Sequence, residues 1–80
     1  MQLDQVKELV MAHLPDCEVE VGGDGNHIDL TIVGDVFEGM SPVKKQQLVY
    51  AGLNEHIASG SIHAVNMKLY TRAEWQKNAE

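Results

Sequence analysis

The chain has 80 residues, 44% of them hydrophobic, and carries 12 acidic side chains against 6 basic ones, a formal net charge of −6. A chain of this length forms a single domain, residues 1–80, and buries only about 60% of the surface that its unfolded form exposes. An enzyme that encloses its substrate normally needs a longer chain. These figures therefore favour a non-enzymatic binding module.

Three features of the sequence bear on where the protein is located. The only cysteine, Cys17, cannot form an internal disulfide, which suits a reducing compartment. The N-terminus lacks the basic start and the continuous apolar stretch of a signal peptide, and no apolar run reaches the roughly 18 residues that cross a membrane. We therefore predict a cytoplasmic protein.

The charge is divided unevenly along the chain. Residues 1–40 hold nine acids and one base, a formal charge of −8, whereas residues 41–80 hold three acids and five bases, a formal charge of +2. Nucleic-acid affinity comes mostly from Lys and Arg, so the balance argues against nucleic-acid binding over the whole surface. A local basic patch remains as a candidate nucleic-acid site or, alternatively, as an ordinary solvated surface. Its members are Lys44, Lys45, Lys68 and Arg72.

The first half of the chain predicts a helix followed by a hairpin. Apolar residues recur at helical spacing over residues 3–14, and Pro15 ends the run. From Cys17 the apolar period changes to two, as in a strand with one wet face. Residues 22–26 are rich in glycine and predict a hairpin turn, and a second strand follows with Ile28, Leu30 and Ile32 on one face.

The second half predicts a long helix, a strand and a short helix. Phe37–Met40 forms a connection with two apolar anchors, and Ser41–Pro42 caps a helix of roughly 16 residues that ends at Gly60. Its expected buried stripe is Val43, Gln46, Val49, Tyr50, Leu53 and Ile57. A third strand is expected over residues 62–70, and Thr71–Glu74 is a capping box for a last helix. Tyr50 and Trp75, on the two helices, are expected to pack in the core.

The predicted fold is α+β, with the element order αββαβα. The hairpin makes the first two strands antiparallel, and a helical crossover favours a third strand parallel to the second, in a three-stranded mixed sheet with helices packed on one face. If the second and third strands are neighbours, both begin at the same end of the sheet, where His27 and His63 lie. Cys17 then falls at the opposite end, about 16 Å away.

These two histidines are the candidate metal ligands. Imidazole is a common metal ligand and can replace cysteine on one iron of a two-iron cluster, but two ligands are too few for a structural zinc site, so a partner would have to supply the rest. The alternative is that His63 is a half-buried histidine at one end of the core face, in line with Val65, and that His27 is an exposed turn residue. His13 and His56 are expected on helix surfaces.

Other sites are less well supported. Gly22–Gly25 has the G-x-x-G spacing of a nucleic-acid backbone clamp, but a hairpin turn explains it better. Cys17 is expected to be a small core residue whose neighbours Glu18 and Glu20 raise its thiol pKa. The motifs of phosphate-binding loops and hydrolases are missing from the sequence.

Several short motifs together resemble the BolA-like family. The segments that carry the resemblance are Phe37–Ser41, Val43–Tyr50, Ile62–Val65, Tyr70–Thr71 and Glu74–Trp75. Joint occurrence of F-x-G, V-Y, H-A and E-W in this order is more specific than any single motif. The short length and the segments Asp24–His27 and Val43–Gln47 are most similar to a compact bacterial subgroup that is linked to acid stress.

The resemblance implies both a fold and a function. The fold would be an αββαβα domain related to type II KH domains. Family members bind monothiol glutaredoxins and share a bridging [2Fe-2S] cluster with them, in iron–sulfur cluster maturation or trafficking, with apo iron–sulfur proteins as further partners, and in iron homeostasis. By this resemblance His63 is the H-A ligand and His27 the loop ligand, while the glutaredoxin cysteine and glutathione supply the others. The loop contains no cysteine, so an all-histidine site on this side would be sensitive to protonation.

Two functional hypotheses follow. The first is a non-enzymatic adapter that binds a monothiol glutaredoxin and contributes His63 and His27 to a shared cluster. The second is a KH-like, nucleic-acid-binding transcriptional regulator of stress and cell morphology that uses the basic patch Lys44, Lys45, Lys68 and Arg72, with DNA as a possible partner. In isolation the protein is expected to be a monomer, or a weak homodimer that associates through the surface around Trp75.

Overall fold

The computed structural model describes the backbone of residues 2–23 and 27–79 and the side chains up to Lys77. Its elements are α1 (Leu3–His13), β1 (Glu18–Gly23), β2 (His27–Val33), a 3-10 turn η1 (Asp35–Phe37), α2 (Pro42–Ala51), α3 (Asn54–Ala58), β3 (Ala64–Tyr70) and α4 (Arg72–Ala79). The predicted α+β fold is confirmed. Asp24–Asn26, which complete the predicted hairpin turn, lie outside the described residues.

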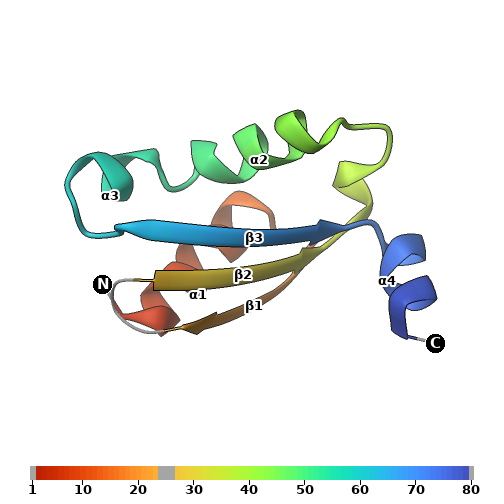
Figure 1. Cartoon of the computed structure of the whole chain (residues 1–80), viewed down its shortest axis with the longest axis horizontal. Helices are drawn as coiled ribbons and strands as arrows, with labels where there is room; N and C mark the ends of the chain where they lie inside the picture. The colour runs from red at the N-terminus through yellow and green to blue at the C-terminus, as the bar shows by residue number, and fades with distance from the viewer. Residues whose placement is uncertain (1, 24–26, 80) are drawn as a thin grey trace.

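The three strands form one mixed sheet in the order β1-β2-β3 (Figure 1). β1 is antiparallel to β2, with Glu18 opposite Val33, and β3 is parallel to β2, with His27 opposite Ala64. Both directions confirm the prediction. Because the side chains of a strand alternate, this register divides the sheet into two faces, which we call the core face and the open face.

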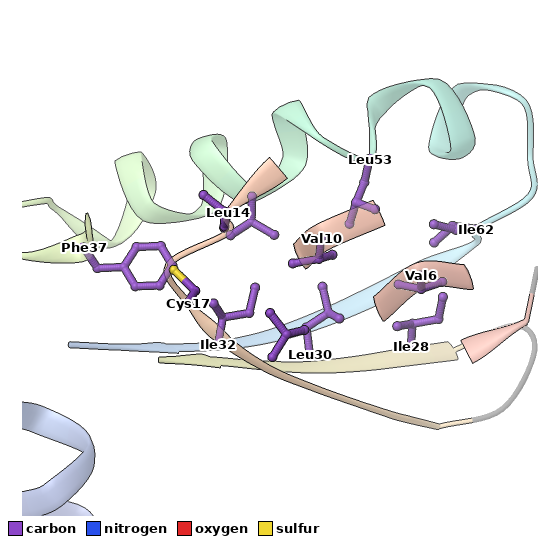
Figure 2. Close-up of a cluster of buried hydrophobic side chains, with 12 residues drawn as sticks. Val6, Val10, Leu14, Cys17, Ile28, Leu30, Ile32, Phe37, Leu53 and Ile62 are labelled. Atoms are coloured by element: carbon purple, nitrogen blue, oxygen red, sulfur yellow. The ribbon is translucent and has the colours of Figure 1, made fainter. Parts of the chain in front are cut away.

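The hydrophobic core lies between the core face and the helices α1, α2 and α3. Figure 2 shows the side chains of this core packed between the sheet and the helical layer. Ile28, Leu30 and Ile32 of the central strand are no more than 1% exposed, and Phe37 of η1 is fully buried. The period-two pattern of the second strand therefore identified the core face correctly.

The long helix predicted over residues 41–60 is instead two helices. α2 ends at Ala51, and α3 begins at Asn54 after a break at Gly52 and Leu53. At the break, a Cβ on Gly52 would lie 2.8 Å from the ring carbon Cγ of His13. The His13 ring also donates through Nε2 to the Leu48 carbonyl at 2.7 Å. The break thus lies where the His13 side chain of α1 packs against the chain.

The predicted buried stripe of this region is correct only toward its C-terminal end. Val49 and Leu53 are buried, whereas Val43 is 62% exposed and Gln46 is also exposed. The first turn of α2 lies beside β3, an outer strand of the sheet, where little of the helix can be covered (Figure 1). Ser41 caps this turn as predicted, because its Oγ accepts from the Lys44 backbone N–H.

The fourth helix departs from the one-sided arrangement. α1, α2 and α3 lie on one face as predicted, but α4 turns to the other side of the sheet at the carboxyl end of β3 (Figure 2). Trp75 is 39% exposed, so the expectation that it lies in the core is wrong. Its ring instead packs on Tyr70, with centroids 5.4 Å apart. α4 is short and packs mainly against β3, and its tryptophan stays partly exposed.

Within the described part of the chain, no helix is long and apolar enough to span a lipid bilayer.

Candidate functional site

His27 and His63 lie at the same end of the sheet, as the topology predicts. His27 is the first residue of β2 and pairs with Ala64, the first residue of β3, so His63 directly precedes its partner. From the spacing of neighbouring strands and of consecutive residues, the Cα atoms of His27 and His63 are no more than about 9 Å apart. Both residues are exposed. The site is therefore open to a second molecule.

The position of His63 is fixed by the residue before it. Ile62 is only 2% exposed, and its backbone N–H donates to the His56 carbonyl at 3.2 Å. Gly60, with a φ of +83°, lets the chain leave α3 in the left-handed conformation that favours glycine. Because Ile62 occupies the core position, His63 is turned to solvent. The alternative of a half-buried His63 in line with Val65 is thus wrong.

His27 lies on the open face, in line with Asp29 two residues along β2. Asp29 is held by a neighbouring strand, because Asn66 Nδ2 of β3 donates to its Oδ1 at 3.0 Å. This polar pair joins β2 to β3 just inside the histidine end of the sheet. The sequence alone did not reveal the pair, although the register of two parallel strands would have placed both residues opposite each other.

The ligand set of this site is incomplete within one chain. Across residues 2–23 and 27–79, no three His, Cys, Asp or Glu side chains come together in a way that could hold a metal ion. Two exposed imidazoles fit one part of an iron–sulfur cluster, since histidine nitrogen can replace cysteine sulfur as an iron ligand. The remaining ligands would have to come from another molecule.

Cys17 is remote from the histidines. It precedes β1 at the opposite end of the sheet, close to Gly34, and is only 7% exposed. Burial raises the pKa of its thiol, the negative charge of Asp16 raises it further, and Arg72 opposes both effects. The predicted direction is right, but the causes are burial and Asp16 rather than the neighbouring glutamates. A protonated, buried thiol is a poor nucleophile and metal ligand.

The two other histidines have structural surroundings. His13 is exposed but, as described above, joins α1 to α2 through the Leu48 carbonyl. His56 is half-buried rather than on the surface, because α3 sits close over Ile62. Neither lies at the start of a strand.

The structure does not gather the predicted basic patch. Lys45 Nζ pairs with Glu74 at 3.6 Å, and Arg72 pairs with Asp35 at 3.9 Å. Lys44 is exposed on α2, while Lys68 lies on the open face, on the other side of the sheet. Two of the four cations are thus matched by acids, and the others are on different surfaces.

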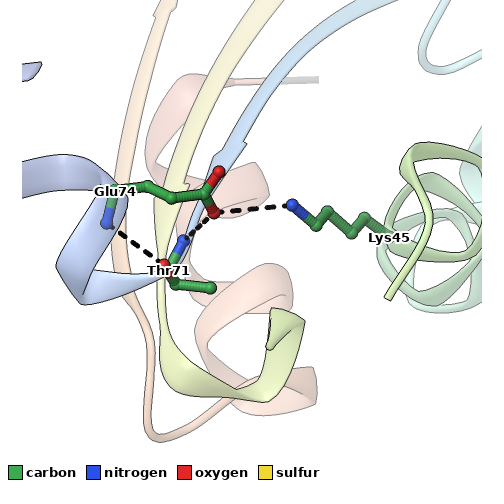
Figure 3. A network of polar contacts seen from close by, with 3 residues as sticks. All are labelled: Lys45, Thr71 and Glu74. Atoms are coloured by element: carbon green, nitrogen blue, oxygen red, sulfur yellow. Dashed lines mark hydrogen bonds and ion pairs between the residues drawn. The ribbon is translucent and has the colours of Figure 1, made fainter. Parts of the chain in front are cut away.

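Glu74 is the centre of a small network that joins α4 to α2 (Figure 3). Its carboxylate accepts from the Thr71 backbone N–H at 2.9 Å, and its own N–H donates to Thr71 Oγ1 at 3.2 Å, which confirms the predicted capping box. The bond from the Thr71 backbone lowers the pKa of Glu74, and the Thr71 side chain and Lys45 contribute. The capping motif was visible in the sequence, but its link to Lys45 was not.

Comparisons with known proteins agree with this architecture. The profile of the BolA-like protein family matches residues 7–74. The chain is 47% identical over 78 residues to the acid stress protein IbaG of Escherichia coli K12, covering 98% of this chain and 93% of that protein. It is 48% identical over 77 residues to an uncharacterized protein from the rpoN-murA intergenic region of Acinetobacter guillouiae, covering 96% and 93%.

Solved structures show the same fold. A bolA protein homologue from Coxiella burnetii aligns with a TM-score of 0.84 at 30% identity, covering 95% of this chain and 97% of that one. The BolA domain of SufE1 from Arabidopsis thaliana aligns with a TM-score of 0.78 at 32% identity, covering 89% and 92%.

Proposed function

Because the chain belongs to the BolA-like family, we propose that it is a non-enzymatic adapter that binds a monothiol glutaredoxin and shares a bridging [2Fe-2S] cluster with it. His63 and His27 are the ligands from this chain. The role we propose is in iron–sulfur cluster maturation or trafficking and iron homeostasis. The relative from Escherichia coli is named an acid stress protein, which supports a link to acid response here.

The observation that carries this proposal is the placement of two exposed histidines at the paired starts of β2 and β3. Their two imidazoles supply half of the four ligands that a two-iron cluster needs. A glutaredoxin cysteine and a glutathione thiol would complete the set. The cluster, when bound, supplies the link between the two proteins and can be passed to an apo iron–sulfur protein.

The residues of this chain have two tasks in such a complex. They present two imidazole side chains, and they hold the backbone at a fixed separation through the β2–β3 ladder. Ile62 keeps His63 outside the core. The backbone pairing of His27 with Ala64 keeps His27 beside the start of β3, next to His63. The structure of the site thus depends on strand pairing rather than on a preformed cavity.

The test is reconstitution of the full chain with a monothiol glutaredoxin, glutathione, iron and sulfide. We expect a heterodimer whose visible absorption and circular dichroism change when His63→Ala or His27→Ala is introduced, with His63→Ala abolishing the mixed cluster. His13→Gln is the matched control, because it removes a histidine from α1 and should leave the spectrum unchanged. A wild-type chain that neither binds the glutaredoxin nor alters its cluster contradicts the proposal.

The acid link can be measured on the same complex. Metal ligation requires neutral imidazole, and histidine ordinarily takes up a proton near pH 6.5. We expect the mixed cluster to be lost as the pH falls from about 7.5 to about 5, faster than from the glutaredoxin homodimer. Equal loss from the two complexes over this range would disprove a role for the histidines in acid response.

A further inference from the structure

The outer edge of β1 is an exposed sheet edge away from the histidine site. β1 is the first strand in the order β1-β2-β3 and, in the part of the chain that the structure describes, it pairs with β2 alone. The outward N–H and C=O groups of such a strand can pair with a further strand. α1 packs against β1 on the core face, and on the open face Glu18 and Glu20 of this strand are exposed.

Two carboxylates mark this edge on the open face. Glu18 and Glu20 are both exposed, and the residues opposite them on β2 are Val33 and Thr31, neither of which is charged. Like charges that face each other across strands are destabilising, so these glutamates disfavour pairing of β1 with a second copy of itself. They favour a neighbouring strand with positive side chains.

The same carboxylates line a shallow hollow with an aromatic wall. The hollow has a volume of about 310 Å³ and is lined by residues of both faces at this edge and by one residue of α1: Glu18, Val19, Glu20, Thr31, Val33, Trp75 and Lys7. A partly exposed tryptophan attracts cations over its ring face, and carboxylates bind guanidinium groups through paired hydrogen bonds. The hollow therefore fits the side chain of arginine or lysine, and Lys7 weakens that attraction without removing it.

We propose that the outer edge of β1 binds an extended segment of a partner protein in which Arg or Lys alternates with apolar residues. Such a segment would add a fourth strand to the sheet, about 4.8 Å from β1. Every second side chain would then lie on the open face beside Glu18, Glu20 and the tryptophan. The side chains between them would lie beside Val19 and Val21, which belong to the core face.

This inference does not depend on the cluster proposal. The histidines meet where β2 pairs with β3, whereas the acidic edge is on the other side of β2. The experiment below uses the chain without iron, sulfide or glutaredoxin, so its failure leaves the adapter function untouched.

The test is titration of the full chain with a capped seven-residue peptide of alternating Arg and Val. Trp75 is the only tryptophan, so its fluorescence reports binding directly. We expect saturable binding that weakens about tenfold in the double variant Glu18→Gln/Glu20→Gln. Glu38→Gln/Glu55→Gln makes the same change in net charge at exposed positions elsewhere and should bind as the wild type does. Lys7→Gln should bind about twofold more tightly.

Several results would overturn the inference. They are no binding, equal binding by the Glu18→Gln/Glu20→Gln variant, and equal binding of a peptide that has the same residues with the arginines grouped at one end. Amide hydrogen exchange with and without the peptide locates the bound segment, and a lack of added protection in β1 would also contradict the proposed edge. If sedimentation of the chain alone shows a dimer with β1 protected, the edge is occupied by a second copy and the partner assignment is wrong.

Discussion

At the residue scale, Gly52 is the position where a single methyl group should have the largest effect. Its backbone, with φ −83° and ψ −10°, suits alanine, and alanine favours helices over glycine by about 1 kcal/mol. The new Cβ, however, would lie within 3.0 Å of three His13 side-chain atoms. To relieve this contact the ring must move and give up its bond to the Leu48 carbonyl.

We therefore expect Gly52→Ala to lower the free energy of unfolding by about 1 kcal/mol, despite its better helix propensity. In a His13→Ala background the same substitution should be neutral or stabilising, because the ring is gone. Urea unfolding of the wild type, the two single variants and the double variant gives the coupling free energy between positions 13 and 52. A Gly52→Ala protein more stable than the wild type would show that His13 does not restrict this turn.

At the element scale, the sheet was easier to predict than the helices. Alternation over β1 and β2 reports directly which side chains face the core, and the helical crossover fixes the direction of β3. The break between α2 and α3 depends instead on a contact with His13 of α1, which no local pattern carries. The third strand was predicted to begin at residue 62, but β3 begins at Ala64. Ile62, rather than His63, is the residue that enters the core.

For the candidate site, too, one part could be predicted from the sequence and another part could not. Its location at one end of the sheet followed from topology, since paired parallel strands begin together. The exposure of His63 depends on how the loop after α3 is anchored, and under the proposed function the other cluster ligands would come from another molecule. Neither of these can be derived from spacing along a single chain.

We expect the packing of α4 to depend on pH, because the Glu74 carboxylate caps this helix and pairs with Lys45 of α2. The Thr71 hydrogen bonds and Lys45 lower the pKa of Glu74, so the ionised carboxylate stabilises the folded state more than the protonated carboxyl does. The resulting stabilisation is complete above the ordinary value near 4.5 and is lost as the pH falls through the lower folded value. We expect Trp75 fluorescence to change below pH 4.5 as α4 frays.

The variant Glu74→Gln should lack most of this transition and should show weaker protection of α4 amides at neutral pH. Glu55→Gln, at an exposed position on α3, is the control and should retain the wild-type transition. An unchanged fluorescence profile in Glu74→Gln would mean that the capping carboxylate does not hold the helix.

At the scale of the whole molecule, the distribution of charge bears on the hypothesis that the protein binds DNA. The chain carries a net charge of −6, and Lys45 and Arg72 are paired with Glu74 and Asp35. Few cations are then left to displace counterions from a phosphate backbone, and binding that uses few phosphate contacts is weak at physiological salt.

We expect the affinity for a labelled DNA duplex to be no better than about 10⁻⁴ M at physiological salt, as measured by fluorescence anisotropy. A salt series then tests the basic residues. The regulator hypothesis gains support if DNA binds and the variant Lys44→Ala/Lys45→Ala reduces the slope of the salt dependence by about two charges. The control Lys77→Ala, on α4, should leave that slope unchanged. Weak binding with the same shallow slope in all three proteins would instead mean that Lys44 and Lys45 do not form a nucleic-acid site and that the acidic surface keeps the chain away from nucleic acid.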